Sequence, residues 1–184
     1  MLPYEPTADD VTRWALAAAT GDDHAMALFV RATQTDVWRL CVHLGDQWAA
    51  DDLAQETYLR AFANLATFAA RSSAKTWLLS IARRVCADHV REQRRIPRLV
   101  ATEPPERGAP GDFTTYAALR SLIDALDPVR REAFVLTQVI GASYAEAADI
   151  CGCPVGTIRS RVARARTDLV EAVREHRGLE SDHG

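Results

Sequence analysis

The feature of this sequence that most constrains its fold is a proline- and glycine-rich run near the middle of the chain. Four of the eight prolines lie between Pro97 and Pro110, and Gly108 and Gly111 accompany them. Proline lacks a backbone N–H and clashes with the preceding helical turn, so neither a helix nor a central strand continues through such a run. We therefore predict two small domains, residues 1–95 and 115–184, joined by a flexible linker over residues 96–114.

The segments on both sides of this linker have the composition of helices. The chain has nine glycines in 184 residues and is rich in alanine, whereas β-branched and aromatic residues are scattered. We expect four helices in the first domain, over residues 10–19, 23–45, 51–65 and from 74 onward, with a loop over 66–73. Asp51 is the expected N-cap of the third helix. The predicted fold class is all-α.

The helix expected from Ala74 has an apolar side and a basic side. Trp77, Ile81 and Val85 recur at steps of four residues and predict the side that packs on a core. The other side presents a basic stripe of Lys75, Arg83, Arg84, Arg91, Arg94 and Arg95. Trp77 has a second interpretation, as a platform on which an unstacked nucleic-acid base could rest.

Charge is segregated along the chain, although the net charge is only −3. Residues 1–56 hold ten acids and three bases, and residues 57–95 hold eight bases and two acids. Residues 157–166 add four arginines and no acid. This pattern indicates two kinds of partner, one of them anionic, although ordinary solvated helix faces would give a similar pattern.

The second domain carries the pattern of a helix-turn-helix. Ser143 and Glu146 form a capping box that opens a short helix, Gly152 is placed to make the turn, and Pro154 suits the start of the following helix. Two helices are expected before this motif, one over 119–126 and one from 127 to the stop at Gly141. A helix-turn-helix places its second helix in the major groove of DNA.

That second helix has a surface suited to the groove. Val155, Ile158, Val162, Ala165 and Leu169 form its apolar stripe. At about 100° per residue, the opposite face holds Thr157, Ser160 and Arg164, with Arg159 and Arg161 on its flanks. Small polar side chains fit a groove about 12 Å wide, and arginine pairs with guanine edges or phosphates. The alternative to a DNA-binding motif is a helical hairpin whose arginines are only solvated.

Several classes of protein are not indicated. No stretch approaches the roughly 18 apolar residues of a membrane span, and the acidic start of the chain does not resemble an export signal, so we expect a cytoplasmic protein. The four cysteines do not form a disulfide framework, and we expect them to pack in helices and turns without a metal. No catalytic motif or phosphate loop is present, and the dispersed histidines are interpreted as surface or satisfied positions, so no enzyme activity and no cofactor are expected.

Three motifs together resemble the extracytoplasmic-function (ECF) group of bacterial sigma factors, over residues 25–169. The first runs from Asp51 to Ala61 and resembles the core-polymerase-binding helix of that family. The second, Thr76 to Arg84, resembles the helix that melts the promoter and recognises its minus-ten element. The third is the helix-turn-helix from Ser143 to Arg166, which resembles the domain that recognises the minus-thirty-five element.

The resemblance implies roles for individual residues. The core-polymerase set, which would dock on the coiled coil of the large clamp subunit, comprises Asp51, Asp52, Leu53, Gln55 and Glu56. The minus-ten set comprises Phe68, Arg71, Ser72, Ser73, Lys75, Thr76, Arg83 and Arg84. The minus-thirty-five set comprises Thr157, Arg159, Ser160, Arg161, Arg164 and Arg166.

The sequence departs from the family pattern at two positions. Arg84 stands where the family often has asparagine, which indicates a phosphate contact in place of a base contact. Ala163 stands where some members carry a larger side chain in the recognition helix. The resemblance implies core RNA polymerase and promoter DNA as partners, an anti-sigma factor as regulator, and a monomer when free.

Two other functions also fit parts of the pattern. A stand-alone helix-turn-helix regulator would be a dimer on a palindromic site. A helical adaptor with solvated arginines would bind DNA with little salt dependence, if at all. Neither needs the motif order of residues 51–95.

Overall fold

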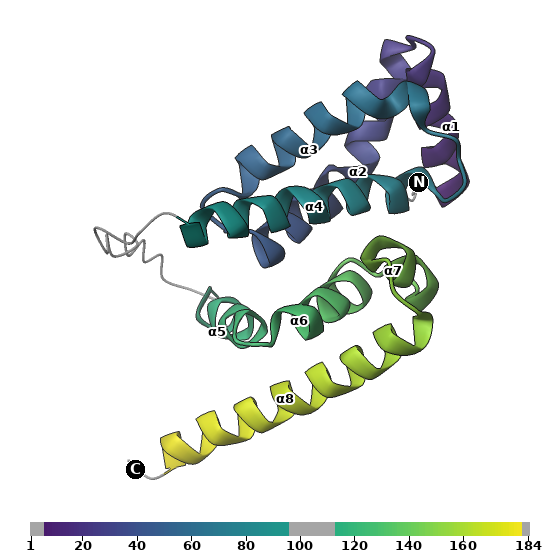
Figure 1. Cartoon of the computed structure of the whole chain (residues 1–184). Coiled ribbons are helices and arrows are strands. Elements are labelled where there is room, and N and C mark those ends of the chain that lie inside the picture. Colours follow the sequence, from purple (N-terminus) through teal and green to yellow (C-terminus); the bar gives the residue numbers. More distant parts are fainter. Residues whose placement is uncertain (1–5, 96–112, 182–184) are drawn as a thin grey trace, which may run out of the picture.

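The computed structural model describes residues 6–95 and 113–181, and every regular element within these ranges is a helix. The N-terminal domain contains α1 (Ala8–Ala19), α2 (Asp23–Leu44), α3 (Ala50–Asn64), the short 3₁₀ helix η1 (Leu65–Thr67) and α4 (Ala74–Arg95). The C-terminal domain contains α5 (Phe113–Asp124), α6 (Pro128–Phe134), the π-helical turn η2 (Val135–Val139), α7 (Tyr144–Cys151) and α8 (Val155–Ser181). The all-α prediction is confirmed (Figure 1). The linker predicted at 96–114 lies outside the described residues up to 112, and α5 begins at Phe113.

The first two helices begin at side-chain caps. Thr7 and Asp10 form a capping box at the start of α1, and the Asp22 carboxylate accepts the Ala25 N–H at 2.9 Å at the start of α2. Such caps satisfy backbone donors that a helix leaves unpaired. Helix α2 then supplies much of the domain core, since Phe29, Val37 and Leu40 are fully buried.

The start of α3 differs from the prediction. Its N-cap position is Ala49, which offers no side-chain hydrogen bond, and Asp51 lies within the first turn. A backbone turn that starts at Asp46, closed by the Ala49 N–H to the Asp46 carbonyl at 3.1 Å, precedes the helix, which begins two residues earlier than predicted. The Asp51 carboxylate is therefore free to accept the indole N–H of Trp38 at 2.9 Å.

The inward face of α4 also differs from the predicted one. Val85 is buried as predicted, together with Leu78 and Leu79, whereas Trp77 and Ile81 are only partly buried at the edge of the core. Residues 77–82 are apolar on most sides of the helix, so their periodicity does not define a face. The packing of α2 and α3 against α4 selects the face that turns inward.

The helix-turn-helix follows the predicted pattern closely. Ser143 and Glu146 form the capping box of α7, and Gly152 ends that helix in the left-handed conformation with φ of 64°. Ile158, Val162 and Ala165 of α8 are buried. The helix expected from 127 to the stop at Gly141 starts as predicted, with Asp127 as its N-cap, but its second half is the π-helical turn η2.

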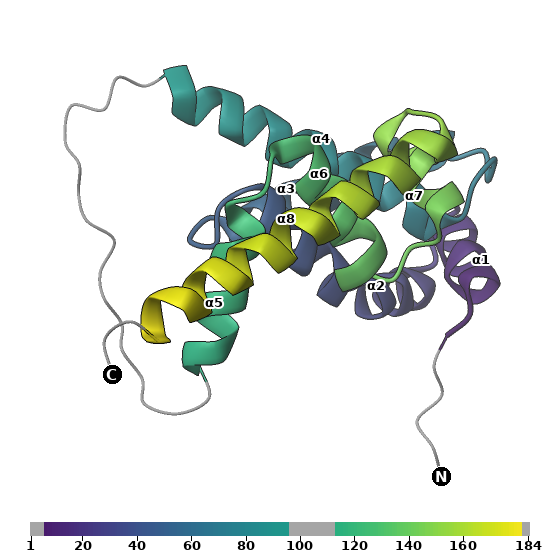
Figure 2. The same ribbon diagram turned by 90° about the horizontal axis from the view of Figure 1, so that it is seen from below.

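The two domains lie against each other. Helix α4 packs on α7, and α2 contacts α5, α6 and η2. Arg83 of α4 forms an ion pair with Glu132 of α6, and Arg120 of α5 donates to the Gln47 side chain. Figures 1 and 2 show α8 on the side of the C-terminal domain that faces away from the N-terminal domain. The outer face of α8 is therefore open.

Candidate nucleic-acid and polymerase interfaces

The outer face of α8 presents three of the predicted minus-thirty-five residues together. Arg159, Ser160 and Arg164 are all exposed, and they lie opposite the buried Ile158, Val162 and Ala165. The Ser160 hydroxyl donates to the Thr157 carbonyl at 2.9 Å, which leaves its lone pairs available. Ala163 lies between these side chains on the helix and adds no bulk, so the face can approach the floor of a groove.

The other three members of this set are partly engaged. Thr157 is half-buried in the first turn of α8, where its N–H donates to the Pro154 carbonyl at 2.9 Å. Arg161 is half-buried and points at the Cys153 sulfur at 3.9 Å. Arg166 is exposed and donates to the Gln138 side chain at 2.8 Å. These positions flank the exposed face, where arginines would meet the phosphate backbone.

The loop before α4 holds the first part of the minus-ten set. Phe68 is 8% exposed and its ring lies 5.0 Å from that of Trp77, so both aromatic rings close the edge of the core in this structure. Ala70 has φ of 49°, the single positive value on a non-glycine residue among those described. This left-handed residue turns the chain just before Arg71, which is exposed.

The polar residues at the start of α4 have structural partners. The Ser73 hydroxyl accepts the Thr76 N–H at 3.1 Å and so caps the helix, and Thr76 itself is buried. Lys75 forms an ion pair with Asp36 of α2 at 2.6 Å. Ser72 is half-buried. Ser73, Lys75 and Thr76 therefore hold the start of α4 in place.

The two arginines of the second motif differ in their environment. Arg84 is exposed, and no described residue forms an ion pair with it. Arg83 is held by Glu132 of the C-terminal domain. Burial works to lower the pKa of Arg83, but the hydrogen bond and charge of Glu132 outweigh it, so the net pKa lies above the usual value. While the two domains lie against each other, Arg84 is exposed and has no ion pair among the described residues, whereas Arg83 is paired with Glu132.

The predicted core-polymerase set surrounds the first turns of α3. Asp52 and Gln55 are exposed, Glu56 pairs with Arg60, and Asp51 accepts from Trp38. Leu53 is 7% exposed and belongs to the core, so it supports this surface from beneath. The result is an acidic helix start, where carboxylates also complement the helix dipole.

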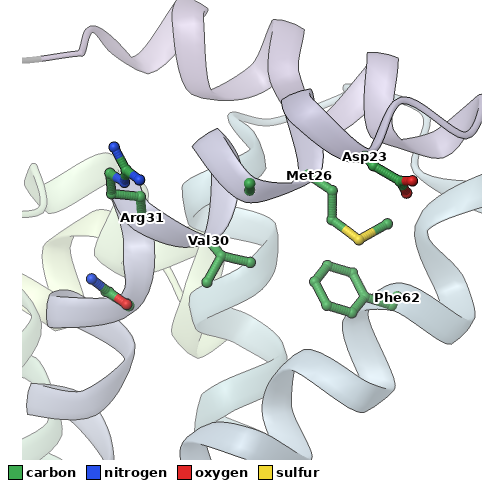
Figure 3. Close-up of a pocket in the computed structure, with 7 residues that line it drawn as sticks. Asp23, Met26, Val30, Arg31 and Phe62 are labelled. Atoms are coloured by element: carbon green, nitrogen blue, oxygen red, sulfur yellow. The ribbon is translucent and has the colours of Figure 1, made fainter.

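A groove between α2 and α3 adjoins this acidic helix start. It consists of two neighbouring hollows of about 470 Å³ each, which share Val30 and Gln34 in their walls. One hollow is walled by Met26 and Phe62, which face each other in Figure 3, and the other by Trp38, Gln55 and Tyr58. Sequence reasoning missed the α2 wall, because its apolar residues merge with the core pattern; the signal was an apolar stripe wider than one packed face.

Tyr58 fixes the floor of this groove. Its hydroxyl lies 2.8 Å from that of Thr33, and burial raises the pKa of the phenol to about 12. The group therefore stays a neutral hydrogen-bonding partner at physiological pH. This contact ties α3 to α2 directly beneath the hollow that Gln55 lines.

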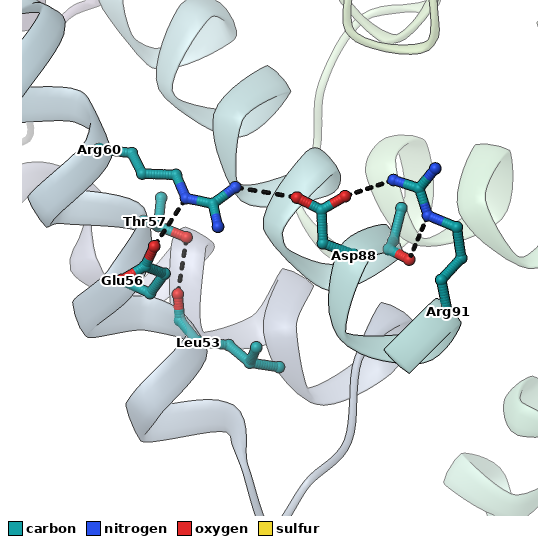
Figure 4. Close-up of polar contacts among 7 residues, drawn as sticks. Leu53, Glu56, Thr57, Arg60, Asp88 and Arg91 are labelled. Carbon is teal, nitrogen blue, oxygen red and sulfur yellow. Dashed lines mark hydrogen bonds and ion pairs between the residues drawn. The ribbon is translucent and has the colours of Figure 1, made fainter. Parts of the chain in front are cut away.

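An ion-pair network that the sequence did not predict joins α3 to α4. Arg60 donates to Glu56 at 2.7 Å and to Asp88 at 2.9 Å, and Asp88 also accepts from Arg91. Figure 4 shows the four side chains in a row with alternating charge. The chain of contacts runs from the predicted polymerase-binding helix to the basic stripe of α4.

The described residues give no sign of a metal site or a membrane span. No three His, Cys, Asp or Glu side chains within them are grouped as metal ligands would be. The helices in these ranges include none that is long and apolar enough to cross a bilayer. The interpretation of the histidines as surface or satisfied positions is wrong for His43, which is 6% exposed and whose Nδ1 has no hydrogen-bond partner among the described residues.

Two family models match the chain, that of Sigma-70 region 2 over residues 29–96 and that of Sigma-70, region 4 over residues 116–169. The fold and the order of the two matched regions are thus those of an RNA polymerase sigma factor. The chain is 52% identical over 165 residues to the ECF RNA polymerase sigma factor SigC of Mycobacterium tuberculosis, which covers 87% of this chain and 89% of that protein. It is 38% identical over 133 residues to EcfG of Rhodopseudomonas palustris, covering 68% and 71%. The chain therefore belongs to the ECF group of sigma factors.

Two solved structures share the fold. CnrH, in complex with the cytosolic domain of CnrY, matches with a TM-score of 0.74 and 25% identity over 92% of this chain and 99% of that one. The sigma factor RpoE, in complex with the anti-sigma factor NepR from Bartonella quintana, matches with a TM-score of 0.66 and 30% identity over 81% and 96%. The family assignment confirms the sigma-factor hypothesis over the stand-alone regulator and the adaptor.

Proposed function

We propose that the two domains of this sigma factor divide promoter recognition between the exposed face of α8 and the loop and helix around Arg84. The factor binds core RNA polymerase and directs it to promoters. The observation that carries the residue assignment is the exposed row Arg159, Ser160 and Arg164, set opposite a buried stripe in a helix-turn-helix. We assign to this row the recognition of base edges in the minus-thirty-five element, and to Arg161 and Arg166 phosphate contacts.

The minus-ten element is assigned to the N-terminal domain. Arg71 and Arg84 are exposed and positively charged, and a single strand held by such groups needs an unstacked base to rest on an apolar surface. The edge-of-core pair Phe68 and Trp77 supplies that surface once the loop opens. The strained backbone at Ala70 is consistent with a loop that changes conformation on binding.

The polymerase is assigned to the groove between α2 and α3. Its apolar walls suit a helix of the clamp coiled coil, and the acidic residues at its rim complement a basic partner. We further propose that the factor acts in the cytoplasm without a catalytic step of its own, and that an anti-sigma factor regulates it. The complex of the related RpoE with NepR supports such a partner.

The experiment that tests the promoter assignment is run-off transcription on fragmented genomic DNA with purified core polymerase. We expect discrete transcripts whose start sites share two spaced upstream elements. Arg164→Ala should reduce transcription from them by roughly tenfold, since one bidentate base contact contributes about 1–3 kcal/mol. Arg174→Ala is the matched control, because it removes the same charge from an exposed position ten residues further along α8. An unchanged promoter preference in Arg164→Ala would remove that residue from the recognition face.

Polymerase docking is tested separately by holoenzyme assembly. Gln55→Ala should weaken the binding of the core enzyme, because Gln55 is exposed and walls the groove. Gln93→Ala, on the exposed side of α4, is the control of the same residue type. Equal assembly by both variants would move the docking surface away from the groove.

A further inference from the structure

Asp88 occupies an unusual position on α4. Residues 84, 88, 91 and 95 follow one another at helical spacing, so at 100° per residue they lie within about 60° of one another on one face. Three of the four are arginines, and Asp88 stands in the middle of them. An acidic residue at this point interrupts what would otherwise be a continuous row of positive charge.

Both oxygens of the Asp88 carboxylate accept hydrogen bonds from arginines. Its Oδ2 accepts from Arg60 at 2.9 Å, and its Oδ1 accepts from Arg91. Arg60 is held a second time by Glu56 at 2.7 Å, in the favourable order with the acid four residues before the base. The hydrogen bonds from Arg60 and Arg91 keep the pKa of Asp88 below its usual value, so the carboxylate stays charged.

This arrangement divides the arginines of the row into two kinds. Arg91 is exposed, but it forms an ion pair with Asp88. Arg84, in contrast, has no ion-pair partner among the described residues. An arginine that neutralises a phosphate releases condensed counterions, and each such contact steepens the salt dependence of duplex binding by about 0.9. Arginines already paired with a carboxylate add less to this sequence-independent binding.

We propose that Asp88 is a specificity-determining residue, which withholds Arg60 and Arg91 from phosphate and so limits the binding of this sigma factor to non-promoter DNA. The inference rests on the proposed function, in which this face of α4 meets the promoter. Asp88 acts through the two arginines and does not itself contact DNA. With Asp88 in place, the charges on the row without an ion pair among the described residues are those of Arg84 and Arg95, and Arg84 is at the end of the row nearer the loop assigned to the minus-ten element.

The test is the binding of the full chain to a labelled random-sequence duplex, followed by fluorescence anisotropy between about 50 and 200 mM salt. Asp88→Asn should bind the duplex several-fold more tightly at the low-salt end. The slope of log affinity against log salt should become steeper by the equivalent of about one to two phosphate contacts. A role confined to stapling α3 to α4 predicts the opposite, a less stable domain and weaker binding. An affinity equal to or below that of the wild type therefore overturns the proposal.

Matched variants distinguish the effect of the ion pairs of Asp88 with Arg60 and Arg91 from an effect of net charge alone. Glu92→Gln changes the net charge by the same amount on the same helix, at an acid with no ion pair among the described residues, and should alter the affinity less than twofold. Asp88→Glu keeps the carboxylate and should behave as the wild type. Asp88→Asn combined with Arg91→Gln should restore most of the wild-type slope. A gain in Glu92→Gln as large as in Asp88→Asn would reduce the effect to net charge and overturn the proposal.

A second comparison does not depend on the folding of Asp88→Asn. In an otherwise unchanged chain, Arg84→Gln should lower the salt slope by about one contact, while Arg91→Gln should change it little. An equal decrease of the salt slope in both variants would contradict the proposed role of Asp88, although α4 would still be a DNA-binding surface. No loss in either, with promoter transcription also unchanged, would instead show that the proposed minus-ten surface lies elsewhere.

Discussion

At the scale of single residues, Gly45 lies where the end of α2 is close to side chains of α3 and α4. It ends α2, and a Cβ placed on it would meet the Leu53 side chain and lie 2.9 Å from the Cys41 carbonyl oxygen. The carbonyl belongs to the helix backbone and cannot move aside without breaking a turn of α2. The need for glycine here follows from the lack of space for a Cβ at this position.

Gly45→Ala should accordingly lower the free energy of unfolding by about 1–3 kcal/mol, the usual cost of forcing extra atoms into a packed core. Gly156→Ala is the control, because nothing lies within 4 Å of a Cβ at that helical position. There alanine should be neutral or stabilise by up to about 1 kcal/mol. Urea unfolding followed by circular dichroism gives both values. A Gly45→Ala protein as stable as the wild type would contradict the close packing described for this corner.

Ala70 stores a small amount of strain in the loop before α4. Its φ of 49° costs a residue with a side chain roughly 1–2 kcal/mol, and glycine is free of that cost. Ala70→Gly should therefore raise the free energy of unfolding by about 1 kcal/mol. Ala69→Gly, at the neighbouring exposed position without positive φ, should lower it by a few tenths through the entropy of the unfolded chain. The same sign for both variants in thermal unfolding would count against strain at Ala70.

At the scale of elements, the sequence predicted those helices whose ends are set by nearby residues. The capping box at Ser143, the left-handed Gly152 and the Asp127–Pro128 start all lie within four residues of the turns they control. The start of α3 and the inward face of α4 could not be predicted in this way. The first depends on the turn over residues 46–49, which places Ala49 with no side-chain cap at the helix start, and the second on which neighbouring helices cover an apolar surface.

The same division holds for the candidate interfaces. The exposed face of α8 followed from helical spacing alone, because one buried stripe defines its opposite side. In the minus-ten set, spacing gave no information about Phe68, which packs on Trp77, or about Arg83 and Lys75, whose partners lie far away in the sequence. The network around Asp88 was missed for the same reason, since Arg60 and Asp88 are 28 residues apart.

At the scale of the whole molecule, the two domains lie against each other in this structure (the closed form), whereas the two promoter elements are far apart. Elements centred about 25 base pairs apart are separated by roughly 85 Å at 3.4 Å per base pair, more than a compact chain of this size spans. The two domains must therefore separate before both elements are bound. The contacts that close them, Arg83 with Glu132 and Arg120 with Gln47, then become part of the energetics of promoter binding.

His43 makes that closure sensitive to pH. It is buried at the contact between α2 and the C-terminal domain, near Asp124 and Arg120 of α5 and Arg131 of α6. Burial lowers the pKa of His43 below 6.5, Arg120 and Arg131 lower it further, and Asp124 opposes them. The closed form therefore binds fewer protons than the open form, in which we expect an ordinary value near 6.5. The contribution of His43 to closure is fully present above pH 6.5 and is lost as the pH falls through that value toward the lower pKa of the closed form.

We expect the radius of gyration in small-angle X-ray scattering to rise between about pH 7.5 and pH 5.5, as protonated His43 is expelled from the contact. His43→Gln keeps a polar side chain that does not titrate, so its radius should no longer respond over this range. His24→Gln, at an exposed position of α2, should respond as the wild type does. A transition of equal size in His43→Gln would assign the pH response to other groups, and a radius that is constant in all three proteins would show that protonation does not open the contact. Opening that depends on His43 would mean that acid releases Arg83 from Glu132 and adds its charge to the surface of α4 assigned to DNA.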